Sequence, residues 1–283
     1  SFPVPPVIAS SPPAPKITDM GGGIQVIFGT GGNIAVSAGP DGVFVIDDQF
    51  ANTAAANLAK VNEIAKGAPR DLLNTHWHSD HAGGNEAFAR AGAMIFAHEN
   101  VRKRLTGEVA SLGLDGKPAA ASPEPARPVI TFHEGMDFHL NGAQIVVTKM
   151  RSSHTDGDSI VRFVEPNILH TGDIMFNGLF PVIDLGSGGS VTGYLEAMKE
   201  IHGMVDDKTR IIPGHGEIAT KADLAKQIAM LDGAIKAVEA RVKAGDTLAQ
   251  GIAKKPLTPW KAFAWSFINE DRFTTILYNG LKK

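Results

Sequence analysis

Three histidines and an aspartate occupy six consecutive positions within the segment NTHWHSDH, residues 74–81. In an extended chain every second side chain faces the same way, so His76, His78 and Asp80 are expected to converge on one side. The Ala-Gly-Gly that follows allows the chain to turn, which would direct His81 toward a different centre. Four ligand-type side chains are more than one tetrahedral zinc ion takes from so short a segment. The pattern therefore predicts two metal ions.

The histidine cluster stands at the end of a strand in a predicted β-α-β unit. Apolar residues spaced by three predict an amphipathic helix over residues 51–67, and a buried strand over residues 71–76 follows it. After the cluster we expect a helix over residues 83–92 and a strand over residues 93–98. Folds of the α/β class place their chemistry at such strand ends, so the position of the cluster favours a functional site.

The rest of the chain alternates short strands with helices. The expected strands are residues 23–28, 32–39, 42–48, 143–150, 158–164, 167–173 and 209–216. Helices are expected over residues 190–205 and 221–245, and Trp260 and Trp265 are expected to anchor a C-terminal helix in the core. Two mixed halves, each ending in a helix, predict an α/β fold in which helices cover layered sheets.

Two segments are expected to stand apart from this core. Residues 1–20 are rich in proline and predict an extended N-terminal tail, which leaves residues 21–283 as a single domain. Because the chain begins with Ser1 and not with Met, we expect a mature periplasmic protein whose signal peptide has been removed. Residues 106–128 are rich in proline, alanine and glycine and are expected to form a flexible insertion.

Composition excludes several classes of protein. The formal net charge of the 283-residue chain is −3, which offers no basic surface to a nucleic acid. No apolar run is long enough for a membrane span, and a chain without cysteine has neither disulfides nor thiolate metal sites. We expect a monomer that acts on a small-molecule substrate and binds metal through histidine and carboxylate groups.

Three further ligand-type residues occur at predicted strand ends later in the chain. His154 lies in RSSHTDGDS, Asp173 in LHTGD and His215 in IIPGHGE. A histidine between two glycines, such as His215, has little to pack against, which favours a role as a metal ligand. A capping role in a loop is the alternative.

These motifs, in this order, resemble those of the metallo-β-lactamase superfamily over about residues 22–220. The resemblance implies a four-layer αββα sandwich with a two-metal site at one edge. By resemblance, one zinc ion is bound by His76, His78 and His154, the second by Asp80, His81 and His215, and Asp173 bridges the two. The implied cofactors are two Zn²⁺ ions, with iron or manganese as alternatives in the cell.

The resemblance also gives a role to Asp47, which closes the strand VFVID and matches a family carboxylate behind the metal site. It is expected to support a ligating imidazole, and capping of the strand end is the alternative. The remaining histidines match no ligand motif and are expected to be packed or exposed: His98, His133, His139, His170 and His202.

A two-zinc site predicts a particular chemistry. Two zinc ions can hold a bridging hydroxide at a pKa of about 7, against about 15.7 for free water. Such a site would hydrolyse an amide, lactam, ester, lactone or thioester without a protein nucleophile. Asp80 is expected to orient the hydroxide and to carry a proton to the leaving group, so it is the predicted catalytic residue. No substrate-binding residue is predicted.

Two positions separate this chain from the most familiar zinc β-lactamases. Those enzymes place a cysteine where this chain has Asp173, and a lysine that binds the drug carboxylate where it has Phe176. The all His/Asp ligand set resembles that of the hydroxyacylglutathione hydrolases (glyoxalase II), but their basic glutathione-binding motif is not recognisable near the C-terminus.

We therefore predict a zinc hydrolase with at least weak, promiscuous β-lactamase activity. Phe176→Lys is expected to lower its Michaelis constant for lactams if the local geometry matches that of the cysteine-containing lactamases. The alternatives are a glyoxalase II-like thioesterase and a metallo-phosphodiesterase or nuclease of the same superfamily.

Overall fold

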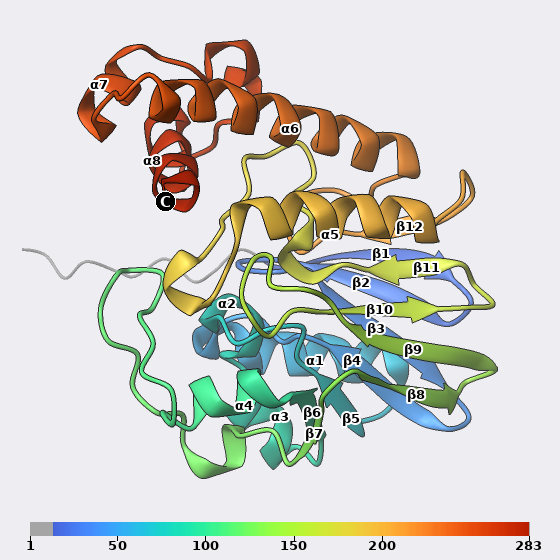
Figure 1. The fold of residues 1–283 in the computed structure, drawn as a ribbon. Coiled ribbons are helices and arrows are strands. Elements are labelled where there is room, and N and C mark those ends of the chain that lie inside the picture. Colours follow the sequence, from blue (N-terminus) through green and yellow to red (C-terminus); the bar gives the residue numbers. More distant parts are fainter. Residues whose placement is uncertain (1–13, 283) are drawn as a thin grey trace, which may run out of the picture.

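A computed structural model describes residues 14–282 of the chain. Figure 1 shows two β-sheets stacked in the middle of the molecule, with helices on both outer faces. The first sheet is antiparallel from β1 to β4 and parallel from β4 to β7, with its strands in sequence order. Its strands are β1 (Lys16–Gly21), β2 (Ile24–Phe28), β3 (Ile34–Gly39), β4 (Gly42–Ile46), β5 (Asp71–Leu73), β6 (Met94–His98) and β7 (Ile130–Phe132).

The second sheet has the strand order β12-β11-β10-β9-β8. Strands β8 to β11 are antiparallel neighbours, and β12 joins β11 in parallel. Its strands are β8 (Gly135–Leu140), β9 (Ala143–Lys149), β10 (Ser159–Phe163), β11 (Ile168–His170) and β12 (Arg210–Ile212).

Helices connect and cover the sheets. The α-helices are α1 (Ala54–Ala65), α2 (Ser79–Ala82), α3 (Asn85–Arg90), α4 (Glu99–Leu105), α5 (Val191–Met204), α6 (Lys221–Lys243), α7 (Leu248–Ala253) and α8 (Glu270–Leu281). Short 3-10 turns occupy Ala51–Thr53, Glu124–Ala126, Gly172–Ile174, Leu185–Ser187 and Thr258–Phe263. None of the helices within residues 14–282 is long and apolar enough to cross a membrane.

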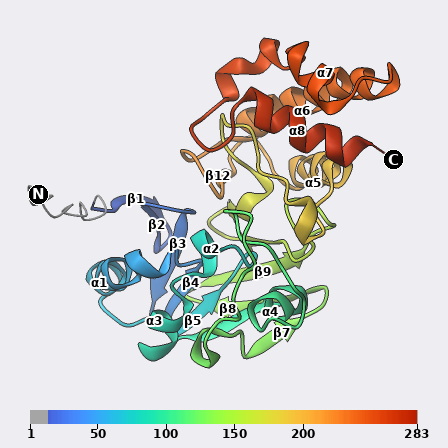
Figure 2. The same cartoon turned by 90° about the vertical axis from the view of Figure 1, so that its left-hand side faces the viewer.

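Three hydrophobic clusters hold four layers together. Between the sheets, the rings of Phe44 and Phe163 meet edge to face. Val61 of α1 packs against the outer face of the first sheet, and Met198 of α5 packs in the cluster outside the second. Figure 2 shows α6, α7 and α8 beside α5, on the opposite side of the molecule from α1 and α3. The layers confirm the predicted αββα sandwich.

The first sheet begins before the end of the predicted tail. Residues 16–20 belong to β1, where residues 16–19 pair with β2 and Met20 lies at an irregularity in the pairing. Ile17 and Met20 each reach a hydrophobic cluster. A strand is recognised in sequence by apolar residues at every second position. Two apolar residues that face opposite sides of the sheet do not form that pattern. The remainder of the predicted tail up to residue 13 lies outside the described residues, and the periplasmic location stays a prediction.

The predicted insertion, residues 106–128, forms a mostly irregular segment that we call the flap. Leu112 and Pro118 form an isolated antiparallel bridge, and the Ala119 amide donates to the Ser111 carbonyl at 2.9 Å. Nη1 of Arg104 on α4 donates to Ser111 Oγ at 2.8 Å. The flap is therefore tied to α4 at its base, and its predicted flexibility stays a prediction.

The C-terminal region departs from the expectation for its tryptophans. Trp260 lies in the 3-10 turn Thr258–Phe263, and Trp265 lies in the loop after it. The last helix, α8, begins only at Glu270, where Asn269 accepts from the Arg272 amide as its N-cap. Neither tryptophan lies in α8, but both pack against the hydrophobic cluster that includes Phe273 of this helix, and Trp265 also lines a cavity.

Candidate metal centre

The histidine cluster follows the short buried strand β5, where the chain passes directly into the one-turn helix α2. His78 is extended, with φ −60° and ψ 147°, and forms the N-cap of that helix. The sequence predicted that the glycines after α2 allow the chain to turn, but in the structure they have another role. Gly83 and Gly84 have ordinary negative φ values, but a Cβ on either would overlap backbone oxygens, those of Ser79 and Asp48 among them. They allow close packing, which brings α2 against the end of β4.

The first candidate metal-binding group consists of His76, His78, His154 and Asp173, all buried. Nε2 of His154 lies 3.2 Å from Nε2 of His76 and 2.8 Å from Nδ1 of His78. Oδ2 of Asp173 is 3.3 Å from the same His154 nitrogen. Ligand atoms of a tetrahedral zinc ion are separated by about 3.3 Å when the metal–nitrogen distance is about 2.0 Å. These spacings fit zinc.

The second candidate group consists of Asp80, His81, His215 and again Asp173. Nε2 of His81 lies 2.9 Å from Oδ1 of Asp173. Nε2 of His215 lies 3.1 Å from Oδ2 of Asp80 and 3.4 Å from Oδ2 of Asp173. Within each group the candidate ligand atoms lie within 4.8 Å of one another. The structure thus brings together all seven predicted ligands, and Asp173 is the residue that both groups share.

The outward nitrogen of each imidazole in the first group has a partner. His154 Nδ1 donates to the Val182 carbonyl at 2.6 Å, and His78 Nε2 lies 2.8 Å from Oδ2 of Asp184. Nδ1 of His76 lies 3.0 Å from Thr75 Oγ1. Since one nitrogen of a neutral imidazole donates and the other accepts, these partners direct lone pairs toward the centre of the group.

Asp47 supports the second group in the place predicted for it. Its Oδ2 lies 2.7 Å from Nδ1 of His81, and its Oδ1 accepts from the Thr75 amide at 2.7 Å. Asp47 is fully buried and has a left-handed φ of 60°, unusual for a residue other than glycine. This backbone turn ends β4 and aims the carboxylate at His81.

Asp184 is a supporting carboxylate that the sequence reasoning missed. It lies in the loop between Asp173 and α5, and its side chain also N-caps the turn Leu185–Ser187. Burial would raise the pKa of Asp184, but the hydrogen bonds with His78 and Ser187 hold that pKa at about 2. No spacing in the sequence connects this residue with His78.

The chemistry of the donors tests whether metal ions fit. His78 Nδ1 and His154 Nε2 face each other at 2.8 Å although their other nitrogens are already bonded, so a shared proton or cation must lie between them. Burial alone would raise the pKa of Asp80, but His81 and His215 hold it at about 2. Oδ1 of Asp80 is buried and has no hydrogen-bond partner within residues 14–282. The donor set fits two cations.

The five other histidines lie outside both groups. His170 is buried, and its Nδ1 accepts from the Gly172 amide at 3.0 Å, which supports the turn that carries Asp173. His98 accepts from the Asn100 amide at the start of α4. The others are partly or fully exposed, as expected for side chains without a ligand role: His133, His139 and His202.

The comparison with known proteins agrees with this geometry. A family model described as the metallo-β-lactamase superfamily matches residues 28–215, about two thirds of the chain. The chain belongs to the metallo-β-lactamase superfamily. The matched region includes every predicted ligand from His76 to His215.

Curated relatives of this superfamily member are distant. A hydroxyacylglutathione hydrolase of Gloeobacter violaceus is 26% identical over 170 residues, which cover 57% of this chain and 59% of that protein. An uncharacterised protein of Mycobacterium tuberculosis is 26% identical over 196 residues, covering 66% of this chain and 85% of that protein.

Solved structures share the fold. A metallo-β-lactamase from Pontibacter korlensis is 17% identical, with a TM-score of 0.65, over 77% of this chain and 99% of that one. A sec-alkylsulfatase from a Pseudomonas species is 18% identical, with a TM-score of 0.67, over 94% of this chain and 50% of that one.

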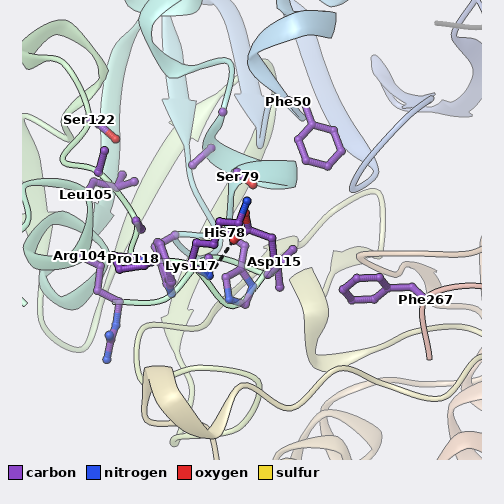
Figure 3. Close-up of a pocket in the computed structure, with 17 residues that line it drawn as sticks. Phe50, His78, Ser79, Arg104, Leu105, Asp115, Lys117, Pro118, Ser122 and Phe267 are labelled. Carbon is purple, nitrogen blue, oxygen red and sulfur yellow. Dashed lines mark hydrogen bonds between the residues drawn. The ribbon is translucent and has the colours of Figure 1, made fainter. Parts of the chain in front are cut away.

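Two cavities of this superfamily member adjoin the candidate ligands. The inner cavity, about 230 Å³, is lined by members of both ligand groups together with apolar side chains. These apolar side chains are Phe50, Leu114, Phe176, Val182, Trp265 and Phe267. The outer cavity, about 710 Å³, extends between α2 and the flap and is lined by residues such as Trp77, Leu105, Pro118 and Ser122 (Figure 3).

Phe176, at the position of the lysine in the familiar lactamases, is almost completely buried. Its ring stacks on that of His215 with centroids 4.9 Å apart and an angle of 15°. The ring centroids of Trp265 and Phe176 are 6.1 Å apart. A lysine here would bury its charge beside His215, so the expectation that Phe176→Lys binds a drug carboxylate does not suit this geometry.

Proposed function

We propose that this protein is a dinuclear zinc hydrolase that cleaves a carbonyl compound: a lactam or other amide, an ester or a lactone. The observation that supports it most is the pair of ligand groups that share Asp173. Both are buried at one end of the sandwich and open into the inner cavity. Iron or manganese could take the place of zinc, because imidazole and carboxylate donors bind these metals as well.

Two zinc ions, held by the two ligand groups that share Asp173, would supply Lewis acidity for a carbonyl oxygen and would lower the pKa of a water molecule. The protein residues then have separate tasks. Asp47 and the Val182 carbonyl fix the imidazoles of His81 and His154 in one orientation. Asp80, whose Oδ2 faces His215 at 3.1 Å, would orient a water molecule and pass a proton to the leaving group.

β-Lactamase activity is proposed as a weak, promiscuous property. The inner cavity offers apolar side chains to a lactam, but Phe176 stands where the familiar lactamases have the lysine that pairs with the drug carboxylate. A charge-assisted hydrogen bond of that kind contributes about 1.5–3 kcal/mol, or roughly ten- to a hundredfold in affinity. We expect measurable lactam hydrolysis with a high Michaelis constant.

A substrate panel tests the proposal against its alternatives. The protein would be depleted of metal with dipicolinate, reconstituted with zinc, iron or manganese, and assayed on nitrocefin, an aryl ester, a γ-lactone, a glutathione thioester and bis-p-nitrophenyl phosphate. We expect zinc-dependent cleavage of the ester and lactone, and slow cleavage of nitrocefin. Preference for the thioester or the phosphodiester would favour the glyoxalase II-like or the phosphodiesterase alternative. Hydrolysis that survives metal removal would overturn the metallohydrolase.

A further inference from the structure

The two cavities are parts of one cleft. Phe50, His78, Leu114 and Phe267 line both of them, so the inner and outer cavities meet directly beside the first ligand group. Figure 3 shows Phe50 and Phe267 at one end of the outer cavity and His78 near its middle. A substrate bound at the candidate metal centre can therefore extend into the outer cavity without leaving the protein surface.

Apolar side chains that are not fully buried gather where the cavities meet. Phe50 follows β4, Leu114 belongs to the flap, and Phe267 belongs to the loop before α8. Each of the three is partly accessible to solvent, and so is Trp265 in the inner cavity. Apolar side chains converging from separate segments on one concave surface indicate a binding site for an apolar group.

Two residues in the C-terminal part of this surface, Trp265 and Phe267, make specific contacts with neighbouring segments. Nε1 of Trp265 donates to the Phe180 carbonyl at 2.9 Å. The guanidinium of Arg272 lies 4.1 Å from the centre of the Phe267 ring and also donates to the Phe267 carbonyl at 2.7 Å. Side chains already fixed before binding lose little conformational entropy when they bind a ligand. These contacts favour preformed recognition of the apolar group.

The charges along the outer cavity do not favour a polyanion. The Arg104 guanidinium is bonded to Asp156 and Ser111, which leaves its charge paired. Asp115 and Lys117 have opposite charges, and the Lys117 amide donates to Oδ1 of Asp115 at 3.0 Å on the exposed flap. A nucleic acid needs a run of unpaired basic groups, so the cleft fits a substrate that is mainly apolar.

We propose that the cleft binds an ester, lactone or amide that carries an apolar chain, with this chain lying between Phe50, Leu114 and Phe267. This inference rests on the proposed hydrolase function and specifies its substrate class. Leu114 and Phe267 then determine specificity through contact with the chain and take no part in the cleavage.

A series of p-nitrophenyl esters with two, four, six and eight acyl carbons tests the inference on the zinc-loaded protein. Burial of one methylene contributes enough to raise kcat/KM by about two- to fourfold. We therefore expect kcat/KM to increase with each step from acetate to hexanoate. Zinc-dependent hydrolysis whose kcat/KM is constant or falls along the series overturns the inference and leaves the proposed function standing.

Matched variants separate a specific contact from general hydrophobicity. Leu114→Ala and Phe267→Ala should each lower the octanoate-to-acetate ratio of kcat/KM by about five- to tenfold. Leu112→Ala is the control, because Leu112 lies on the same flap, is 52% exposed and lines neither cavity. A ratio that changes equally in all three variants, with unchanged melting temperatures, overturns the assignment of the chain to this surface.

A binding experiment keeps the inference testable if no ester is hydrolysed, which would count against the proposed function alone. Butanoate, hexanoate, octanoate and decanoate would be titrated into the zinc-loaded protein by calorimetry. Affinity that rises with chain length, and rises less in Leu114→Ala than in Leu112→Ala, supports the inference. Affinity independent of chain length overturns it.

Discussion

Nε2 of His78 lies 2.8 Å from Oδ2 of Asp184, a residue 106 positions later in the chain. The contact holds the imidazole so that Nδ1 faces His154 in the first ligand group. A carboxylate in this position fixes the ring and increases the basicity of the ligating nitrogen. Asp184 is therefore a positioning residue that can be tested apart from the ligands.

Asp184→Ala is expected to weaken binding of one zinc ion by about 10- to 100-fold, because His78 loses its fixed orientation. Asp184→Asn should have a smaller effect, since the amide oxygen can still accept from Nε2. Zinc affinities would be measured by competition with a chromophoric chelator. Asp232→Asn serves as the control, because Asp232 only pairs with Lys236 on the surface of α6. Wild-type affinity in Asp184→Ala would show that the contact has no effect on the metal site.

Asp173→Ala is expected to weaken both metal ions, because both ligand groups contain Asp173. His215→Ala should weaken only the second ion, since His215 belongs to one group. Metal content after dialysis against a weak chelator would be measured by plasma mass spectrometry. If Asp173→Ala kept one ion as tightly as His215→Ala, the shared role of Asp173 would be wrong.

His98→Asn is expected to reduce the loss of stability that the wild type shows as the pH falls below about 6.5. Burial and the charge of Lys149 lower the pKa of His98 below its usual value. The unfolded chain therefore takes up this proton at a higher pH than the folded protein does. The stability that neutral His98 contributes is present above about pH 6.5 and is lost as the pH falls through the folded-state pKa. Neutral His98 caps α4, and asparagine caps a helix without titrating.

The melting temperatures of wild type and His98→Asn, both saturated with zinc, would be compared between pH 8 and pH 5. The wild type should lose about 1 kcal/mol more than the variant, or roughly 2–4 °C in a protein of this size. Parallel curves for the two proteins would contradict a capping role for the neutral ring.

Phe176→Lys is expected to destabilise the protein by about 3 kcal/mol or more, because it removes a buried ring and buries a charge. The Michaelis constant for lactams should not fall. Phe176→Leu is the control that keeps an apolar side chain against His215. Thermal unfolding and nitrocefin kinetics would be measured together. A lower Michaelis constant with an unchanged melting temperature would mean that the lysine reaches the inner cavity.

Local sequence identified the ligand-type residues after β5 but not all of their directions. An extended chain was expected to turn His76, His78 and Asp80 to one side, but β5 ends at Leu73. Asp80 lies in the helical turn α2 and joins His81 in the second ligand group. The long helix α6 was predictable, because its pattern of apolar residues persists through Lys221–Lys243. The partners His154, Asp173 and His215 were identified by their resemblance to family motifs.

Only the tertiary structure decided which distant side chains surround these ligands. Asp184, Trp265 and Phe267 lie in loops, where no periodicity indicates the direction of a side chain. Their positions depend on how the chain after β11 packs against α5, α6 and α8 in the cluster outside the second sheet. The ligand-type residues could be recognised in short sequence motifs, whereas the supporting carboxylate and the apolar cleft arise from long-range packing, which no short segment contains.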